Sequence, residues 1–477
     1  MESRPSPAER SAAVAVGPRG MVGLLVAVIV ALALPVDPWS VPSLLVVGLV
    51  LVGVWRVAPG HGYARSALLL ACGALWLTHL ARIPLLLETP ELFRYPLYGP
   101  IGPGDLHRVG YRIAVEAALF LVPFAAALPR EAPRDRGGPE DRGFLRRNLM
   151  AVAGVSLVLV LVRVALLGVG VGFLGLSSGR LGAVTQLVPE ILLLAVAVFF
   201  LLTRRPGSSV AWWFFLAMTT LLALATVLRG SKAALLRVLF VSAAVWLFWI
   251  PRVRIRISRG VARAAVAAAL VWVSFGAGLW VRAEVAGIRS TSVPFLTAAR
   301  GVPLLDQARL GLNEISGRLL GLDGRLLVER GGTERLAEAL TLERAALGAA
   351  AQLLPGVDQP GVPMGKAVSV YASGHSWDFP NEGGVGLLAS AHFLGGSFYW
   401  ALLAAAGLGF GLVFRFVARI RDRDARAVVA TVVGYALVVT VMSGNVDRQA
   451  ALLVIALVQV VFYGVLVRFL TRALGRA

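Results

Sequence analysis

The stretch Ala225–Phe240 reads ATVLRGSKAALLRVLF, and apolar runs lie on both sides of its polar centre. That centre consists of Arg229, Gly230, Ser231 and Lys232, although the chain has lysine at only one other position. A short basic turn between two apolar runs is typical of two consecutive membrane-spanning helices. The stretch therefore predicts a helical membrane fold, in which the function of this turn depends on the side of the membrane that it faces.

The composition of the whole chain supports the same fold class. Of its 477 residues, 58% are hydrophobic and 15% are charged, and the mean hydropathy is +0.78. A soluble domain carries roughly 25% charged residues. Apolar runs of roughly 17–25 residues, the length of a helix that spans a bilayer, recur from end to end. A membrane β-barrel would show short alternating segments instead. We predict an all-α, polytopic integral membrane protein.

The apolar runs, bounded by Arg or Pro, predict about twelve transmembrane helices. The first run is interpreted as a retained helix, because no small-residue cleavage site follows it. The expected organisation is a cytoplasmic tail (1–20), nine helices (21–281), a large extracytoplasmic loop (282–383), three helices (384–470) and a second cytoplasmic tail (471–477). The predicted spans are Met21–Leu34, Val41–Val57, Ser66–Leu87, Gly110–Leu128, Leu149–Leu176, Leu187–Leu202, Val210–Leu228, Ala233–Ile250, Val261–Val281, Gly384–Phe416, Ala427–Met442 and Ala450–Leu470.

Arginine predicts the orientation of these helices. With the N-terminus in the cytoplasm, the loop Pro129–Arg147, the segments PRVRIRISRG and RFVARIRDRDAR and the C-terminal tail all fall inside. The net charge of +20 therefore reflects membrane topology. No nucleic-acid recognition module is visible, so we expect no nucleic-acid partner. The distribution of arginine predicts that both termini lie in the cytoplasm. The compositional bias towards Arg, Ala, Val, Gly and Leu suggests a GC-rich bacterial genome.

The predicted external loop is much longer than the others. Loops of this length are usually functional or disordered. The loop contains a helix-like stretch, Gly331–Leu354, and the aromatic residues Tyr371, Trp377 and Phe379. Apolar periodicity together with aromatic residues predicts an ordered external cap.

Several cations are expected on the outer side, against the general trend for short loops. Lys232 opens a helix after Gly230 and Ser231, so backbone N–H groups and the helix dipole add positive potential there. Arginine adds a bidentate fork for phosphate. The alternative is that these side chains are interfacial anchors for lipid head groups. The residues predicted to bind an anionic ligand are Arg180, Arg229, Ser231, Lys232, Arg282 and Arg289.

Charged residues also occur inside apolar runs, where they are costly and usually pair or face the interior of the bundle. They are Glu116, Arg163, Glu190 and Arg237. The sequence allows an ion pair between Arg163 and either Glu190 or Glu116. Such a pair is compatible with a structural role and with a functional one.

Histidine supplies the candidate base. His375 lies in YASGHSWDFPNEGG, just before the tenth predicted span, and His392 lies at the start of that span. A neutral imidazole there can take a proton from a sugar hydroxyl. We predict His375 as the base, with Glu382 and His392 as rivals, although a loop histidine is often only structural. Cys72 stands alone and no metal-ligand spacing occurs, so we expect no metal and no cofactor.

Three features together resemble the Wzy-type polymerases of oligosaccharide repeat units and the related O-antigen ligases, which are membrane glycosyltransferases of the GT-C class. They are the number of spans, the Gly230-Ser231-Lys232 turn after Arg229, and one large external loop before a Gly-rich late span. That span reads EGGVGLLASAHFLGGSFYWALLAAAGLGFGLVF. The loop reads HSWDF where a ligase would carry His followed by Asn, which favours a polymerase.

The resemblance implies transfer of a glycan from one undecaprenyl-diphosphate carrier to a hydroxyl on another, at the outer face of the bacterial plasma membrane. It implies membrane lipids, chain-length regulators and flippases as partners. The chemistry needs a pyrophosphate clamp, for which outward Arg and Lys are suited. We therefore expect a polymerase of lipid-linked repeat units. The alternatives are a ligase and a transporter of lipid-linked sugars.

Overall fold

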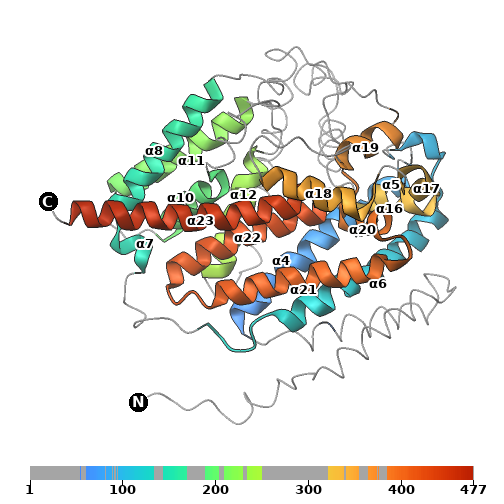
Figure 1. Cartoon of the computed structure of the whole chain (residues 1–477), viewed down its shortest axis with the longest axis horizontal. Helices are drawn as coiled ribbons and strands as arrows, with labels where there is room; N and C mark the ends of the chain where they lie inside the picture. The colour runs from blue at the N-terminus through green and yellow to red at the C-terminus, as the bar shows by residue number, and fades with distance from the viewer. Residues whose placement is uncertain are drawn as a thin grey trace, which may run out of the picture.

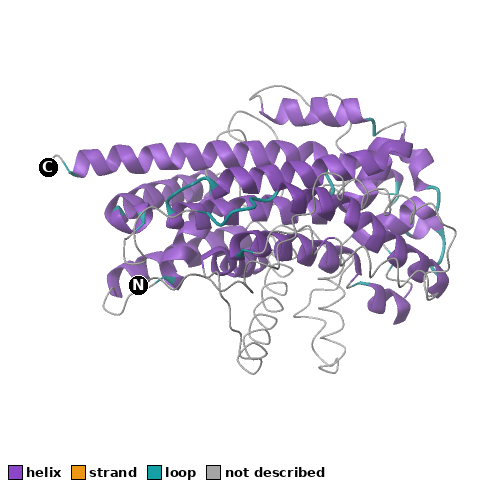
Figure 2. Ribbon diagram, turned by 90° about the horizontal axis from the view of Figure 1, so that it is seen from below, coloured by secondary structure: helices purple, strands orange, loops and turns teal. Residues whose placement is uncertain are grey.

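The computed structural model describes residues 54, 61–80, 82–88, 90, 93, 95–133, 143–168, 189–203, 209–228, 234–249, 321–337, 340–353, 364–372, 374 and 384–475. Within these ranges the chain is helical, with no strand (Figure 2). The predicted spans Met21–Leu34 and Val261–Val281 and nearly all of Val41–Val57 lie outside them.

The helices are labelled in Figure 1. Their bounds are α4 Gly62–Leu75, which continues as a π-helical turn Trp76–Leu80, α5 Ile83–Glu88, α6 Pro103–Ala127, α7 Phe144–Arg147, α8 Leu149–Gly168, α10 Glu190–Leu202, α11 Ser209–Leu228, α12 Ala234–Trp249, α16 Gly321–Glu329, α17 Gly332–Ala337, α18 Leu342–Leu353, α19 Met364–Tyr371, α20 Gly386–Gly395, α21 Tyr399–Ala418, α22 Arg423–Ser443 and α23 Val446–Leu474, with 3₁₀ turns at Pro96–Tyr98 and Gly396–Phe398.

Among the described helices, four are long and apolar enough to cross a membrane. They are Pro103–Ala127, Gly386–Ala418, Arg423–Ser443 and Ala451–Leu474. The prediction of an all-helical protein with several helices that could cross a membrane is thus confirmed for this part of the chain. The number of about twelve spans and their orientation stay predictions.

The predicted span Gly384–Phe416 is not one straight helix. The region Gly386–Ala418 has 33 residues, which as a straight helix would measure about 50 Å and exceed the ~30 Å hydrocarbon core. The chain bends instead at Gly395 and Gly396, and Gly396 has a φ of +49°. The Gly-Gly pair makes this bend accessible, because glycine adopts positive φ without a steric cost. The result is a short buried helix, α20, followed by the long α21.

α6 and α21 form the most extensive helix–helix contact in the described part of the chain. Gly407 and Gly411, four residues apart on α21, face α6, where an added Cβ would run into the carbonyl oxygens of Phe120 and Phe124. Small residues at this spacing let two membrane helices approach closely. α21 is therefore held tightly against α6, and this packing fixes the position of the preceding turn and of α20.

The buried side chains form two hydrophobic clusters. One involves α4, α6, α16, α20 and α21, and the other α8, α10, α11 and α12, with α22 contributing to both. α21 and α23 run along the long axis of the molecule (Figure 1). Polar side chains that lie among the buried residues of the first cluster are therefore in the interior of the helix bundle.

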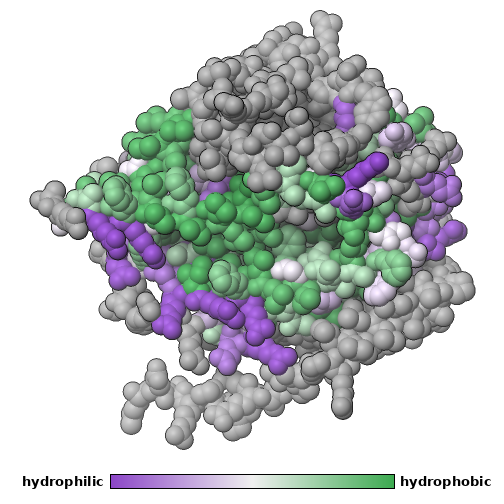
Figure 3. Space-filling model, in the orientation of Figure 1, coloured by the Kyte–Doolittle hydropathy of each residue, from purple (hydrophilic) through white to green (hydrophobic). Residues whose placement is uncertain are grey.

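The basic segments gather at one end of the bundle, where the end of α12, α7, the end of α21 and the start of α22 lie. Arg146 binds Asp424 at 2.9 Å, and Arg423 donates a hydrogen bond of 2.9 Å to the carbonyl oxygen of Trp249. Both guanidinium groups also lie over the Trp249 ring. Hydrophilic residues border the apolar face on this side (Figure 3). This arrangement agrees with the prediction that these segments share one side of a membrane; that this side is the cytoplasm stays a prediction.

A candidate functional site between α6, α16 and α20

Of the residues predicted to form a site, the described part of the chain includes His392. The other candidates lie outside the described residues, so their convergence on one pocket stays a prediction. They are His375, Glu382, Arg180, Arg229, Ser231, Lys232, Arg282 and Arg289.

Three elements bring charged side chains together around His392. Glu116 lies in the middle of α6, Arg325 lies on α16, and His392 lies in the last turn of α20. α16 comes from the segment predicted as an external loop, yet it packs against α20, α6 and the π-helical turn, and residues 321–327 are buried. The predicted helical stretch is confirmed as α17 and α18. The loop thus contributes a buried helix as well as surface structure.

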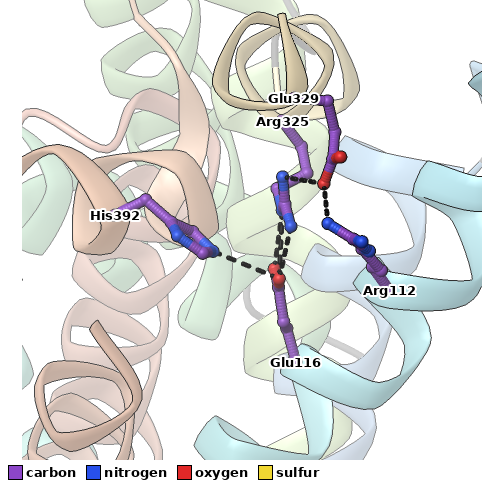
Figure 4. Close-up of polar contacts among 5 residues, drawn as sticks. All are labelled: Arg112, Glu116, Arg325, Glu329 and His392. Atoms are coloured by element: carbon purple, nitrogen blue, oxygen red, sulfur yellow. Dashed lines mark hydrogen bonds and ion pairs between the residues drawn. The ribbon is translucent and has the colours of Figure 1, made fainter. Parts of the chain in front are cut away.

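Glu116 is the centre of the cluster (Figure 4). Its carboxylate accepts hydrogen bonds from Arg325, with Nη2 at 2.7 Å from Oε1 and Nε at 2.9 Å from Oε2. The same Oε1 lies 3.1 Å from Nε2 of His392. The exposed fractions of the side chains are 1% for Glu116, 2% for Arg325 and 13% for His392. Glu116 therefore orients the imidazole from within the core.

A second ion pair links this centre to the surface. Nη1 of Arg325 lies 2.8 Å from Oε1 of Glu329, which also binds Arg112. Further out, Arg330 binds Asp105 at 2.6 Å. The pairs run from half-exposed positions to fully buried ones along the facing surfaces of α6 and α16. Each charge in the series has an opposite charge beside it, which offsets the cost of burial.

Arg325 stays charged in this environment. Burial alone would lower the pKa of its guanidinium, but the carboxylates of Glu116 and Glu329 raise that pKa above its ordinary value. On the other side of α16, Asp323 and Arg82 form a buried ion pair of 2.6 Å. α16 is thus held in the bundle by ion pairs from two directions.

Tyr399 limits the motion of the His392 ring. It opens α21, directly after the 3₁₀ turn, and its ring stacks on the imidazole with centroids 3.7 Å apart and an interplanar angle of 19°. Because Glu116 is an acceptor, Nε2 of His392 donates to it, so a neutral imidazole has its lone pair on Nδ1. No described residue hydrogen-bonds to Nδ1, and this nitrogen is the one that can accept a proton.

His79 is a second buried histidine close to this region. Its Nδ1 donates a hydrogen bond of 3.1 Å to the carbonyl oxygen of Leu75, which leaves Nε2 with no hydrogen-bond partner among the described residues. Gly321 and Gly386 pack against the ring. His79 belongs to the predicted span Ser66–Leu87, and no function was predicted for it from the sequence. A buried nitrogen without a partner is uncommon and marks this packing as unusual.

Two of the charges inside apolar runs have partners that the sequence analysis did not consider. Glu190 binds Arg237 at 2.9 Å, and Glu116 binds Arg325. The side chain of Arg163 lies outside the described residues. Sequence reasoning missed Arg325 and Glu329 because they belong to a segment assigned to a loop. The available signal was the stretch LDGRLLVER, in which charges alternate with leucines at helical spacing.

Comparison with known proteins finds no match: no family model, no curated protein and no solved structure matches this chain. Within the described residues, no group of three or more His, Cys, Asp or Glu side chains is placed to hold a metal ion. The chemistry of the cluster therefore has to be judged from Glu116, Arg325 and His392 themselves.

Proposed function

We propose that this protein is a membrane glycosyltransferase that joins oligosaccharide repeat units carried on a lipid diphosphate. The observation that carries the proposal is the contact between Glu116 and His392 in the interior, at a helix break. A buried carboxylate that holds an imidazole in one tautomer is the arrangement of a general base with its orienting group. The sequence resemblance to repeat-unit polymerases supplies the substrate class.

In the proposed step, a hydroxyl oxygen of the acceptor sugar attacks the anomeric carbon of the donor glycan. The bond between that carbon and the diphosphate oxygen breaks, and the lipid diphosphate leaves with the electron pair. The hydroxyl proton passes to Nδ1 of His392, and Glu116 stabilises the imidazolium that forms. Arg325 balances the charge of Glu116 through their ion pair. The predicted cations Arg229 and Lys232 would hold the diphosphate.

The position of the cluster along the bundle supports this proposal. From Tyr399 to Arg415, α21 rises by 16 residue steps of 1.5 Å, or about 24 Å. His392 therefore lies most of a hydrocarbon thickness away from the arginine-rich end. If that end is cytoplasmic, as the positive-inside rule predicts, the cluster lies towards the outer leaflet. Glycans on lipid diphosphates are the expected substrates there.

A transporter of lipid-linked sugars is the second candidate. The break between α20 and α21 and the buried ion pairs favour it, because interrupted helices and intramembrane charges are common in transporters. A ligase would use the same chemistry with a different acceptor.

Reconstitution separates these functions. The purified protein is placed in liposomes with a fluorescent oligosaccharide on undecaprenyl diphosphate. A polymerase yields longer glycans on the lipid, and a ligase yields product only when a second acceptor lipid is added. A transporter moves unchanged lipid to the other leaflet. Absence of any longer glycan, with the protein folded and the substrate present on both leaflets, would overturn the proposed function.

A further inference from the structure

The end of α21 carries a hollow on the outer surface of the bundle. Leu412, Arg415, Phe416 and Arg419 line it, and its volume is about 360 Å³. These positions follow the spacing i, i+3, i+4 and i+7, so all four side chains lie on one face of α21. The hollow begins 13 residues, or about 20 Å, beyond Tyr399. It is therefore separate from the cluster around Glu116.

The two arginines of the hollow, Arg415 and Arg419, have exposed side chains. Among the described residues, neither guanidinium group has a hydrogen-bond or ion-pair partner. By contrast, three nearby guanidinium groups bind acceptor atoms within the protein. These contacts are Arg146 with Asp424, Arg423 with the Trp249 carbonyl and Arg426 with the Ile420 carbonyl.

The helix end does not need these side chains as caps. The N–H groups of Arg419 and Ile420 donate to the carbonyl oxygens of Phe416 and Val417, so backbone groups close the last turn. Two guanidinium groups one turn apart, without a partner in the described part of the chain, remain beside the hollow. Together they offer forked N–H donors suited to phosphate oxygens.

An apolar strip leads along the same helix to these arginines. Leu408 and Leu412 are 45% and 47% exposed, and Phe416 is 64% exposed. α21 belongs to a helix long and apolar enough to cross a membrane, so these side chains would lie beside acyl chains. The face thus has an apolar part towards the centre of the span and a cationic part at its end. Such a face is complementary to an amphiphile with an anionic head group.

We propose that this face binds one anionic phospholipid, with its phosphate between Arg415 and Arg419 and an acyl chain along Leu408 and Leu412. A net negative lipid is expected, because the choline ammonium of a zwitterionic lipid opposes the guanidinium charges. The nearby arginines add positive potential, although Arg146 and Asp424 largely cancel each other. This inference does not depend on the proposed glycosyl transfer.

The test uses the full chain, delipidated in detergent and titrated with phosphatidylglycerol or phosphatidylcholine, with bound lipid counted by native mass spectrometry. The variant R415Q/R419Q removes the charges, and R421Q is the matched control, because Arg421 is exposed at the same end but does not line the hollow. The native chain and R421Q should bind the first phosphatidylglycerol about tenfold more tightly than phosphatidylcholine. R415Q/R419Q should lose that preference and keep its unfolding temperature.

Three outcomes would overturn the inference. R415Q/R419Q could retain the preference, or R421Q could lose as much of it, which would show only a diffuse charge effect. Inorganic phosphate at low millimolar concentration could displace all phosphatidylglycerol, which would identify a site for a soluble anion. The variant L412N tests the apolar part: it should weaken lipid binding several-fold, and unchanged lipid binding would count against the acyl-chain contact.

Discussion

Glu116 illustrates at the scale of a single residue why a buried charge is kept. Its carboxylate has almost no contact with water, and two groups, Arg325 and His392, satisfy it. An ion pair in such a place contributes little net stability compared with apolar residues of the same size. Its retention is better explained by what Glu116 does to His392 than by stability.

Removal of one partner of the ion pair should therefore destabilise the protein far more than removal of both partners. Arg325→Met leaves the Glu116 carboxylate buried beside only an imidazole and should cost about 3–5 kcal/mol in the free energy of unfolding. The double variant E116Q/R325M should recover most of this loss. Arg112→Met, at a 43% exposed side chain that binds Glu329, should cost less than about 1 kcal/mol. Unfolding in mixed micelles measures all three, and equal losses for R325M and the double variant would contradict the account.

Gly386 is a second residue whose identity the structure explains. Its φ is +75°, and an added Cβ would lie 2.5 Å from the Cα of Gly321 and 3.2 Å from Nε2 of His79. Backbone atoms of α16 cannot move aside as a flexible side chain would. Gly386→Ala should therefore destabilise the protein by about 2–4 kcal/mol, the sum of strain at positive φ and overpacking.

The control for this substitution is Gly464→Ala on α23. An added Cβ there meets no atom within 4 Å, and the backbone is helical. This variant should be neutral or slightly stabilising, because alanine has less freedom than glycine in the unfolded chain. If both variants unfold at the same temperature, the close packing of α16 on α20 is wrong.

Among the helices, the pair α6 and α21 depends on glycine at two positions and not at a third between them. Gly407 and Gly411 face the α6 backbone, whereas an added Cβ at Gly409 meets nothing within 4 Å. Gly407→Ala should separate the helices and cost about 1–3 kcal/mol, while Gly409→Ala should not. Because α21 carries Tyr399 at its start, G407A should also reduce glycan transfer. Thermal unfolding and the reconstituted transfer assay check both effects, and a stable G407A variant would contradict this packing.

The geometry at the start of α4 predicts that the stability of the protein depends on pH. His61 donates from Nε2 to the Pro129 carbonyl at 2.6 Å and accepts from the Ala64 N–H at Nδ1, an arrangement that only the neutral imidazole can make. Burial lowers the pKa of His61, the hydrogen bond to Pro129 raises it in part, and Arg65 lowers it further. With the folded pKa below the unfolded value of about 6.5, the cap stabilises the protein above that value. Its contribution is lost as the pH falls through the lowered pKa.

The variant His61→Asn tests this directly, because asparagine caps a helix at any pH. The native chain should lose about 1 kcal/mol of stability between pH 7.5 and 5, beyond the loss that H61N shows over the same range. Unfolding temperatures in detergent across that range measure the difference. Parallel curves for the two proteins would show that His61 does not titrate with folding.

At the scale of the molecule, apolar length alone predicted several of the described helices closely, whereas α7, α16 and α19 were not among the predicted spans. The spans Leu187–Leu202, Val210–Leu228 and Ala233–Ile250 correspond to α10, α11 and α12 within a few residues. Such helices follow from a local property, the length of an uncharged run. The bend at Gly395 and Gly396 was not predicted, because this Gly-Gly pair lies within a continuous apolar run.

The candidate site could not be predicted in the same way. Arg325 and Glu116 are 209 residues apart, and their contact depends on the folding of a charged segment into the bundle. A rule that assigns charged segments to loops fails when opposite charges from two helices neutralise each other. His392 was a candidate from its position near the start of a span, but its partner and its stacking on Tyr399 depend on tertiary packing. The predicted phosphate-binding residues lie outside the described part of the chain and stay a prediction.

The central claim is that His392, oriented by Glu116, accepts a proton during glycan transfer. The most direct measurement is the rate of the first transfer in liposomes for the native protein and for His392→Gln. Glutamine can still donate to Glu116 but does not accept a proton at neutral pH, so the fold should be kept. The rate should fall by about 10²–10⁴-fold with an unchanged unfolding temperature. A rate within a few-fold of the native protein would contradict the claim and leave His392 a structural residue.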